Sequence, residues 1–183
     1  MTTIHMGKIM ARFVSLAAGA ALLFAGSAAF AQGAKLTDPQ IAHIAYTAGV
    51  VDIAAAQQAL KKSNNPKVKA FAQDMVRDHT SVNDQALALC KKLGVTPEDN
   101  DTSKSIAKNG EEERTKLDSL SGAAFDKAYA ENEVAYHHMV DSSLENTLIP
   151  GASNAELKSL LSTGLKIFKG HEEHARTLAA GLK

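Results

Sequence analysis

The amino-acid sequence predicts an all-α fold, a four-helix bundle made of two antiparallel helical hairpins. Apolar residues recur at helical spacing along most of the chain, strand patterns are nearly absent, and a long polar connection separates the two halves. That connection, residues 95–120, is too long for a bundle in which every loop is short. It can climb the side of the bundle as a crossover, and we expect one or two short helices within it.

Four long helices are bounded by recognisable start and stop signals. The start signals are Thr37 with Pro39 and Gln40 for the first helix, Asn65 with Pro66 for the second, Ser121 for the third, and Ser153 or Asn154 for the fourth. The first helix is expected to end near Ser63 and the second near Leu93, where Gly94 supplies a left-handed cap. The third is expected to reach residues 148–151. Two hairpins joined by one crossover are the topology of ferritin-like folds, which we predict here.

The first 31 residues have the features of a cleaved secretory signal peptide. Lys8 and Arg12 form a basic start, the run FVSLAAGAALLFAGSAAF is apolar, and AFA at residues 29–31 is a small-x-small cleavage signal. A transmembrane anchor is the competing interpretation, but the cleavage pattern and the polar start of the mature chain argue against it. We therefore expect residues 32–183 to form one soluble, exported domain in the periplasm.

The composition of the predicted mature chain excludes several classes of function. Removing residues 1–31 leaves 18 Lys and Arg against 20 Asp and Glu, a charge balance with no basic surface for nucleic acid. No later apolar run approaches the ~20 residues that span a bilayer, so no transmembrane segment is expected. Cys90 is the only cysteine, which excludes an internal disulfide, and its leucine neighbours predict a small buried side chain.

Polar residues interrupt the apolar face of each predicted helix. They are Asp52 on the first helix, His79 on the second, Glu133 and His137 on the third, and His171 on the fourth, with His174 at the edge of that face. The clearest case is His79, which stands in the centre of an unbroken alternation of apolar residues by four and three. Glu133 and His137 are four residues apart, so their side chains can touch. Because buried polar groups must find partners, these residues indicate a shared cluster.

The axial positions of these residues can be compared along the bundle. Asp52 and His79 are equally far from the turn between Asn65 and Pro66, so they are expected to face each other ~20 Å from that end. His137 is expected at a similar height in the third helix. His171 is expected to lie about six residues nearer the turn, ~9 Å off level and closer to Glu133.

Two interpretations of the cluster follow from the residues alone. In the first it is a structural network, with Asp52 paired to His79 and Glu133 paired to His137. In the second, three imidazoles and one or two carboxylates bind one divalent metal ion, for which zinc, copper and iron suit this ligand set. Outer carboxylates would then orient the imidazoles.

Other metal and cofactor chemistries are less well matched. The di-iron pattern needs two Glu-x-x-His pairs, but Val76 and Val134 stand three residues before His79 and His137. A single cysteine excludes covalent haem attachment through Cys-x-x-Cys-His. Non-covalent haem between a histidine and a methionine such as Met75 stays open. No nucleophile elbow, phosphate loop or dinucleotide fingerprint occurs, so no catalytic residue is identified.

Three separated motifs carry a family resemblance: NNPKVKAFAQDMVRDHTSVN, LSGAAFDKAYAENEVAYHHMV, and LIPGASNAELKSLL followed by HEEHA. Over about residues 37–180 the chain resembles the bacterial domain-of-unknown-function family 4142, whose members are often labelled predicted outer membrane proteins. The resemblance implies a ferritin-like bundle in an exported protein and no established activity. The matching polar positions are Asp52, Asp78, His79, Asp126, His137, His171 and His174. The outer-membrane label has no support in alternating ten-residue strands or a lipidation cysteine.

Three functional hypotheses result. The first is a periplasmic bundle whose interior cluster binds a divalent metal ion and acts in metal handling or envelope stress. The second is a non-catalytic envelope structural or interaction protein, in which the interior polar groups only fix helix packing. The third, a hydrolase or redox enzyme, requires an open pocket at the cluster.

Overall fold

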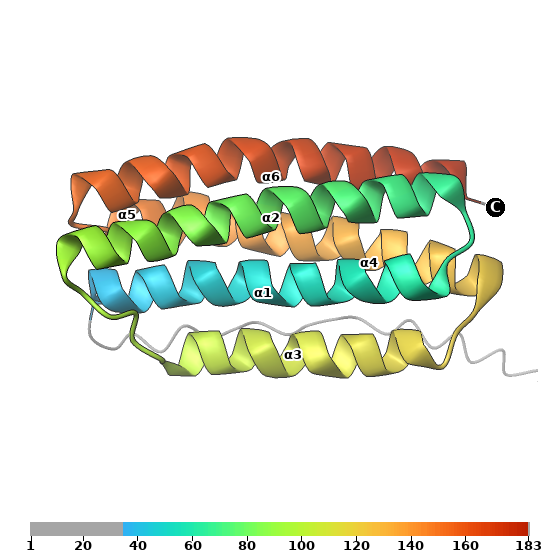
Figure 1. Ribbon diagram of the computed structural model, residues 1–183, viewed down its shortest axis with the longest axis horizontal. Helices are drawn as coiled ribbons and strands as arrows, with labels where there is room; N and C mark the ends of the chain where they lie inside the picture. Colours follow the sequence, from blue (N-terminus) through green and yellow to red (C-terminus); the bar gives the residue numbers. More distant parts are fainter. Residues whose placement is uncertain (1–34, 183) are drawn as a thin grey trace, which may run out of the picture. The chain divides into compact units, whose positions relative to one another are not determined.

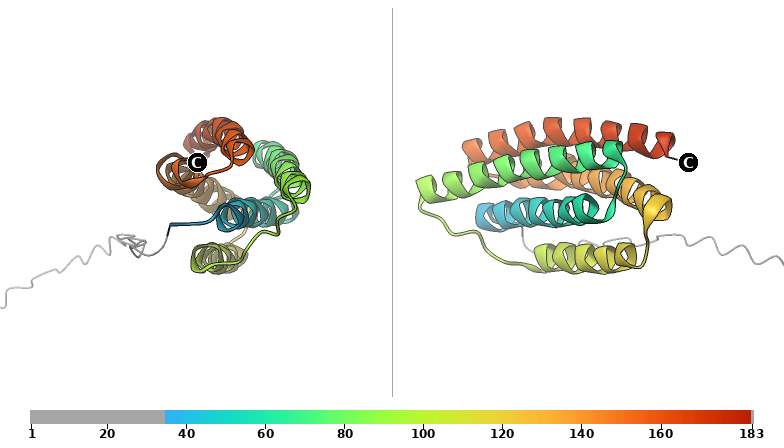
Figure 2. Two further views of the ribbon diagram at one scale, coloured as in Figure 1. Left: turned by 90° about the vertical axis from the view of Figure 1, so that its left-hand side faces the viewer. Right: turned by 45° about the vertical axis from the view of Figure 1, so that its right-hand side comes forward.

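The structure is a computed structural model that describes residues 35–182, so the predicted signal peptide and its cleavage site lie outside the described residues. The elements in chain order are α1 (Asp38–Lys62), α2 (Pro66–Leu93), α3 (Asp101–Asp118), α4 (Gly122–Ser143), the π-helical turn η1 (Leu144–Leu148), α5 (Ile149–Gly151) and α6 (Ala155–Gly181). Helices α1, α2, α4 and α6 lie side by side as a bundle, with α3 along its outside (Figure 1, Figure 2). No strand occurs within residues 35–182, which confirms the predicted all-α bundle.

The helix ends of the first hairpin agree with the sequence signals. The hydroxyl of Thr37 accepts a hydrogen bond from the backbone N–H of Gln40, and the Gln40 side chain accepts one from the backbone N–H of Thr37. Asn65 accepts from the backbone N–H of Lys67 at 2.9 Å. Gly94 ends α2 with a φ of 66°, a left-handed conformation that glycine adopts without steric cost. These local signals fix where the hairpin begins and turns.

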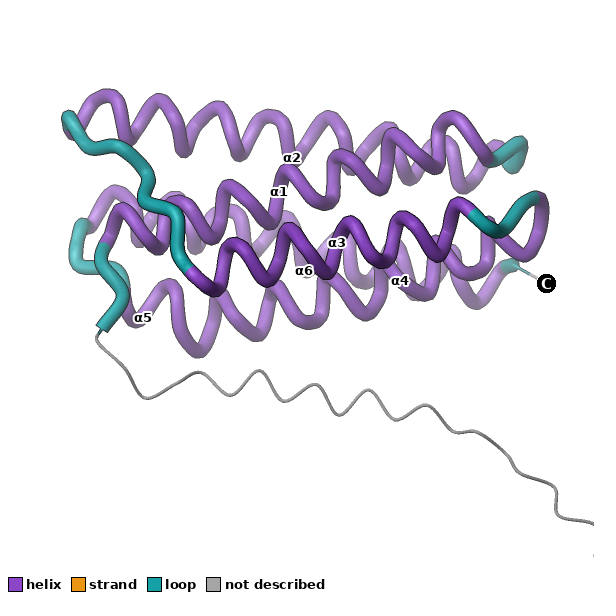
Figure 3. The backbone as a smooth tube through the Cα atoms, turned by 90° about the horizontal axis from the view of Figure 1, so that it is seen from below, coloured by secondary structure: helices purple, strands orange, loops and turns teal. Residues whose placement is uncertain are grey.

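The crossover differs from the prediction of short helices. Most of residues 95–120 form one helix, α3, of 18 residues. It starts at a capping box formed by Asn100 and Ser103, and no proline interrupts it. Helix α3 runs alongside α1 and returns the chain to the end of the bundle that holds the α1–α2 turn (Figure 1, Figure 3). Contacts with α1 stabilise this polar helix.

Contacts between α3 and α1 combine a close backbone approach with polar bonds. A Cβ placed on Gly110 would lie only 2.4 Å from a methyl carbon of Val51. Gln58 donates a hydrogen bond to the Asp118 carboxylate at 2.7 Å, and Leu117 is buried. The side of α1 that faces away from the bundle interior is therefore covered by α3.

The second hairpin contains a local irregularity at its turn. The backbone N–H of Ile149 bonds to the carbonyl of Leu144, five residues earlier, which defines the π-helical turn η1. Pro150 follows, and proline lacks an N–H and clashes with the carbonyl four residues before it. The wider turn accommodates this clash. Of the two predicted caps for α6, the structure selects Asn154, which accepts from the backbone N–H of Glu156 and Leu157.

A polar layer divides the apolar core of the described residues into two parts. We use this name for Asp52, His79, Glu133, His137 and His171, all of which are buried. One apolar cluster lies toward the α1–α2 turn and the other toward the opposite end of the bundle; the first includes Phe71, Met75, Phe125, Tyr129 and Leu178, and the second includes Ile41, Ile44, Leu144, Leu161 and Phe168. Along each of the four bundle helices, the polar residues stand between members of the two clusters.

Candidate metal centre

The polar layer is assembled from all four long helices. Asp52 comes from α1, His79 from α2, Glu133 and His137 from α4, and His171 from α6. Each of these residues is between 1 and 7 % exposed. The prediction that polar residues from separate helices meet in a mostly dry interior is confirmed by these positions.

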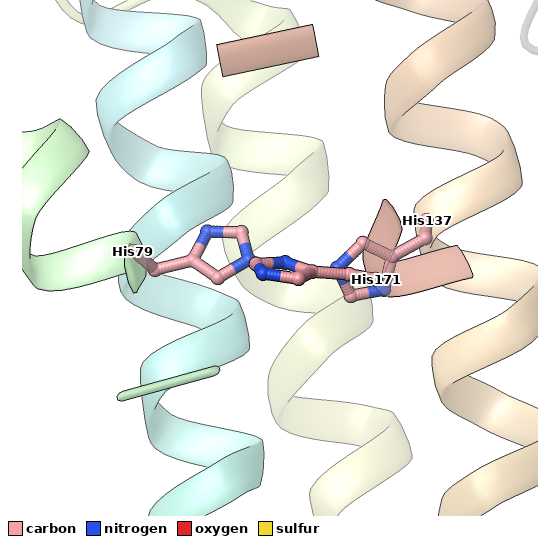
Figure 4. A group of neighbouring side chains, drawn as sticks. All are labelled: His79, His137 and His171. Atoms are coloured by element: carbon pink, nitrogen blue, oxygen red, sulfur yellow. The ribbon is translucent and has the colours of Figure 1, made fainter. Parts of the chain in front are cut away.

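Three imidazoles form the centre of this layer (Figure 4). The ring centroid of His79 lies 5.6 Å from that of His137 and 5.4 Å from that of His171, and the His137 and His171 centroids are 5.4 Å apart. One nitrogen from each ring lies within 4.8 Å of the other two. Phe168 stacks on the His79 ring, with the centroids 4.5 Å apart and the planes 7° from parallel, and thereby fixes its orientation. The three rings converge on one point.

The axial position predicted for His171 is wrong. The structure places its ring next to the rings of His79 and His137, whereas the residue count predicted an offset of about six residues. Every Cα–Cβ bond of an α-helix tilts toward the N-terminus of that helix. Because α4 and α6 are antiparallel, His137 leans toward the α1–α2 turn and His171 leans away from it. The residue count did not include this opposite lean of the two side chains.

Asp52 places a carboxylate oxygen between two of these rings. Its Oδ2 lies 3.5 Å from Nε2 of His79 and 3.5 Å from Nε2 of His137. In a tetrahedral site with metal–nitrogen bonds of about 2.0–2.1 Å, neighbouring ligand atoms are about 3.4 Å apart. The two distances from Asp52 match that value, and the His171 nitrogen lies within 4.8 Å of a nitrogen of each of the other two rings. The three imidazoles form one potential ligand set, and Asp52 adds a carboxylate oxygen beside two of them.

The outer nitrogens of two histidines are held by hydrogen bonds. Nδ1 of His137 lies 3.0 Å from the backbone carbonyl of Glu133 and donates to it. Nε2 of His171 lies 3.1 Å from Oδ2 of Asp78. In both rings the remaining nitrogen is buried and has no hydrogen-bond partner among residues 35–182. Metal-binding histidines characteristically donate their second N–H to a carbonyl or carboxylate, which is the arrangement found here.

Burial keeps the imidazoles neutral. It lowers the pKa of His79 well below its ordinary value and lowers the pKa of His137 to about 4, and the neighbouring imidazoles add to both effects. The pKa of His171 is also lowered by burial, although its hydrogen bond to Asp78 opposes the shift. Neutral imidazole is the form that offers a lone pair to a metal ion. Each neutral ring therefore has one nitrogen with a lone pair available to a cation.

The pKa values of the two buried carboxyl groups, Asp52 and Glu133, shift in the opposite direction. Burial raises the pKa of Asp52 to about 7, with hydrogen bonding to Glu133 opposing the rise. Burial and the nearby charge of Asp52 raise the pKa of Glu133 well above its ordinary value. Oxygens of these two residues and a nitrogen of His137 also lie within 4.8 Å of one another, which makes a second triad that shares His137. A bound cation would favour the ionised form of either carboxyl group.

Sequence reasoning overlooked the roles of several residues around the layer. Tyr136 donates its hydroxyl to the carbonyl of Ala48 at 2.9 Å, and the pKa values of Tyr129 and Tyr136 are raised by burial and by the nearby carboxylates. Asp78, which touches His171, belongs to a matching motif, but its place on the edge of α2 gave no indication of this contact. The sequence feature that could have indicated this contact is its position next to His79, because adjacent residues of a helix point toward different neighbours.

Two other polar residues from the sequence analysis lie outside the cluster. His174 is exposed, and its ring packs edge-on against Phe71 with the centroids 5.0 Å apart. Asp126 is buried but is not within ligand distance of either triad.

Cys90 is buried as predicted, which raises the pKa of its thiol. Among residues 35–182, no helix combines the length and apolar character needed to cross a bilayer.

Fold and site together define a class of protein: an all-α bundle with histidines and carboxylates buried at its centre. The chain belongs to the family described as a domain of unknown function, DUF4142, which matches residues 24–178. This match confirms the resemblance identified from the motifs. Comparison with curated proteins found no match, and comparison with solved structures found none either.

Proposed function

We propose that this protein binds one divalent transition-metal ion at the centre of its bundle and acts in metal handling in the periplasm. The ligands are one nitrogen each of His79, His137 and His171, with Oδ2 of Asp52 as the fourth. Imidazole and carboxylate ligands in a four-coordinate arrangement suit zinc, copper or iron. Glu133 lies beside Asp52 and His137 and supports these ligands.

One observation carries this proposal. One nitrogen from each of three buried imidazoles lies within 4.8 Å of the other two, and a buried carboxylate oxygen lies 3.5 Å from two of the rings, although the four residues come from four different helices. A buried polar atom without a partner costs roughly 1–3 kcal/mol. Gathering several such atoms in one place is unfavourable for the fold unless they bind something together.

The predicted signal peptide supports the cellular location. An exported chain meets metal ions outside the cytoplasm, where glutathione does not compete for them. A buried site favours retention of an ion over rapid exchange, because the ligands are almost inaccessible to water. This property suits storage, buffering or scavenging better than catalysis on a substrate, for which the helices would have to separate.

Metal analysis of the purified protein tests the proposal. The chain is expressed with its own N-terminal segment, stripped with a chelator and incubated separately with zinc, copper and iron. We expect close to one equivalent of at least one ion after removal of the excess, and loss of that ion in His79→Ala and His171→Ala. Metal contents well below one equivalent with all three ions would overturn the proposal.

One observation favours a second candidate function. Because the pKa values of Asp52 and Glu133 are both raised, the two carboxyl groups can share a proton and hold α1 against α4 without a metal. The protein would then be a structural or interaction component of the envelope. In that case no ion binds, and Asp52→Asn or His79→Gln mainly lowers the free energy of unfolding.

A further inference from the structure

We infer that Asp78 is the positioning residue that makes His171 a metal ligand, because it holds the ring in the tautomer whose Nδ1 lone pair faces the polar layer. This inference rests on the proposed metal site and names the residue that prepares one of its ligands. It starts from the contact between Asp78 Oδ2 and His171 Nε2, which are 3.1 Å apart. This contact links α2 to α6 at the edge of the cluster.

The Asp78 carboxylate is itself held in place. Nε of Arg77 donates to its Oδ1 at 2.7 Å, and Nη2 of Arg77 donates to its Oδ2 at 3.0 Å. Because both of its oxygens accept N–H groups of one guanidinium, Asp78 forms a bidentate ion pair as a carboxylate. An ionised carboxylate can only accept hydrogen bonds. Its partner Nε2 must therefore carry the proton of the His171 ring.

The position of that proton decides what His171 presents to the interior. When Nε2 of a neutral imidazole is protonated, Nδ1 is the atom with the free lone pair. Nδ1 of His171 is buried and has no hydrogen-bond partner among the described residues. Without Asp78, the ring could take the other tautomer, in which Nδ1 carries a proton and cannot bind a cation.

Two adjacent residues of α2, Asp78 and His79, have different roles at this site. His79 points into the layer and stacks on Phe168, whereas Asp78 is partly exposed and reaches His171 from the side. Successive residues of an α-helix are about 100° apart around its axis, so one dipeptide serves both the interior and the α2–α6 edge. Outer residues that orient a metal-binding histidine typically contribute 10–100-fold to affinity.

Asp74 provides a matched control. It lies one turn before Asp78 on α2, has the same charge and also bonds Arg77, at 2.6 Å. It makes no hydrogen bond to His171 among the described contacts. A general effect of surface charge on metal binding should therefore appear in both Asp74→Ala and Asp78→Ala, whereas a positioning effect should appear only in the second.

Two measurements on the purified full chain test the inference. In the chelator-treated protein, nitrogen-15 NMR of the His171 ring reports its tautomer; competition with a chelating dye then gives the zinc affinity. We expect Asp78→Ala to move His171 away from the Nε2-protonated tautomer and to weaken zinc binding by about 10–100-fold. Asp74→Ala, which removes a charge but no hydrogen bond to His171, should change both quantities much less. Asp78→Asn, which retains an acceptor oxygen, should recover part of the loss.

The possible failures are distinguishable. An unchanged His171 tautomer in Asp78→Ala, or equal losses of affinity in Asp74→Ala and Asp78→Ala, would overturn the positioning role. Absence of zinc, copper and iron binding by the unsubstituted protein would instead overturn the proposed function. The tautomer measurement does not depend on metal, so it decides the role of Asp78 toward the ring in either case.

Discussion

Oδ2 of Asp52 lies 3.5 Å from Nε2 of His137, although the two residues come from different hairpins. Nδ1 of this histidine donates to the backbone of Glu133, so the nitrogen that faces Asp52 carries a lone pair. A lone pair and an ionised carboxylate repel each other in a dry interior. A cation between them, or a proton on the carboxyl group, removes that repulsion. The following predictions separate these two solutions.

Asp52→Asn should change the pH dependence of stability in the metal-free protein. The folded pKa of Asp52 is about 7 against an ordinary value of 3.8, so between these values the folded state binds a proton that the unfolded state has lost. Stability from this group is fully present below about pH 4 and is lost as the pH rises through about 7. Asparagine cannot ionise, so the variant does not lose this stability. Its free energy of unfolding relative to wild type should therefore rise as the pH increases from about 4 to about 7, by at most about 4 kcal/mol.

Ionisation of His137 changes the stability in the opposite direction over a similar pH range. Its folded pKa is about 4, below the ordinary 6.5, so its contribution to stability is present above pH 6.5 and lost as the pH falls toward 4. This effect is common to wild type and Asp52→Asn and largely cancels in their difference. Urea unfolding with chelator at pH 4.5 and 7.5 measures that difference. An advantage of the variant that shrinks with rising pH would contradict the raised pKa of Asp52.

His79→Gln should abolish stabilisation by zinc with little effect on the metal-free fold. A ligand that binds only the folded state, present at 100 times its Kd, stabilises by about 2.7 kcal/mol. The variant lacks one of the four proposed ligands, so the same zinc concentration should give it almost none of this gain. Its metal-free stability should change by about 1 kcal/mol, as is common for single substitutions. Urea unfolding with zinc and with chelator measures both; equal zinc stabilisation of wild type and variant would exclude His79 as a ligand.

His174→Ala should leave metal binding unchanged. Its ring is exposed and contacts Phe71 instead of the polar layer. Loss of this edge-on contact should lower the free energy of unfolding by about 0.5–1.5 kcal/mol. Zinc affinity by dye competition should equal that of wild type. A loss of affinity comparable to that of His171→Ala would place His174 in the site after all.

Gly110→Ala should loosen α3 from α1. The new Cβ would lie 2.4 Å from Cγ1 of Val51, so the two helices must separate or Val51 must leave its preferred rotamer. Overpacking of this kind costs about 1–3 kcal/mol, which should outweigh the gain of about 1 kcal/mol from replacing a helical glycine. Thermal or urea unfolding measures the net loss.

Gly170→Ala is the control for this substitution. Gly170 lies within α6, and a Cβ added there would meet nothing within 4 Å. This variant should gain up to about 1 kcal/mol from helix propensity alone. If Gly110→Ala were equally stabilising, the close approach of α3 to α1 would be refuted.

Local features of the fold were predictable from short stretches of sequence. The capping box at Thr37, the cap at Asn65 and the left-handed Gly94 each depend on a few neighbouring residues, and all three occur as expected. The helical character of the connection was also predicted, but its single long helix was not. Its polar composition gives no apolar stripe from which to infer the contact with α1, which depends on Gly110 and on side-chain bonds.

The sequence by itself determined that Asp52, His79, Glu133, His137 and His171 face the interior, because helical periodicity fixes which face a residue occupies. Only the tertiary structure determined their positions along the bundle axis. Counting residues from a turn gives neither the axial register of packed helices nor the opposite lean of side chains on antiparallel neighbours. For the same reason the tertiary structure alone revealed that His171 meets His79 and His137, that Asp78 holds its outer nitrogen, and that His174 lies outside the layer.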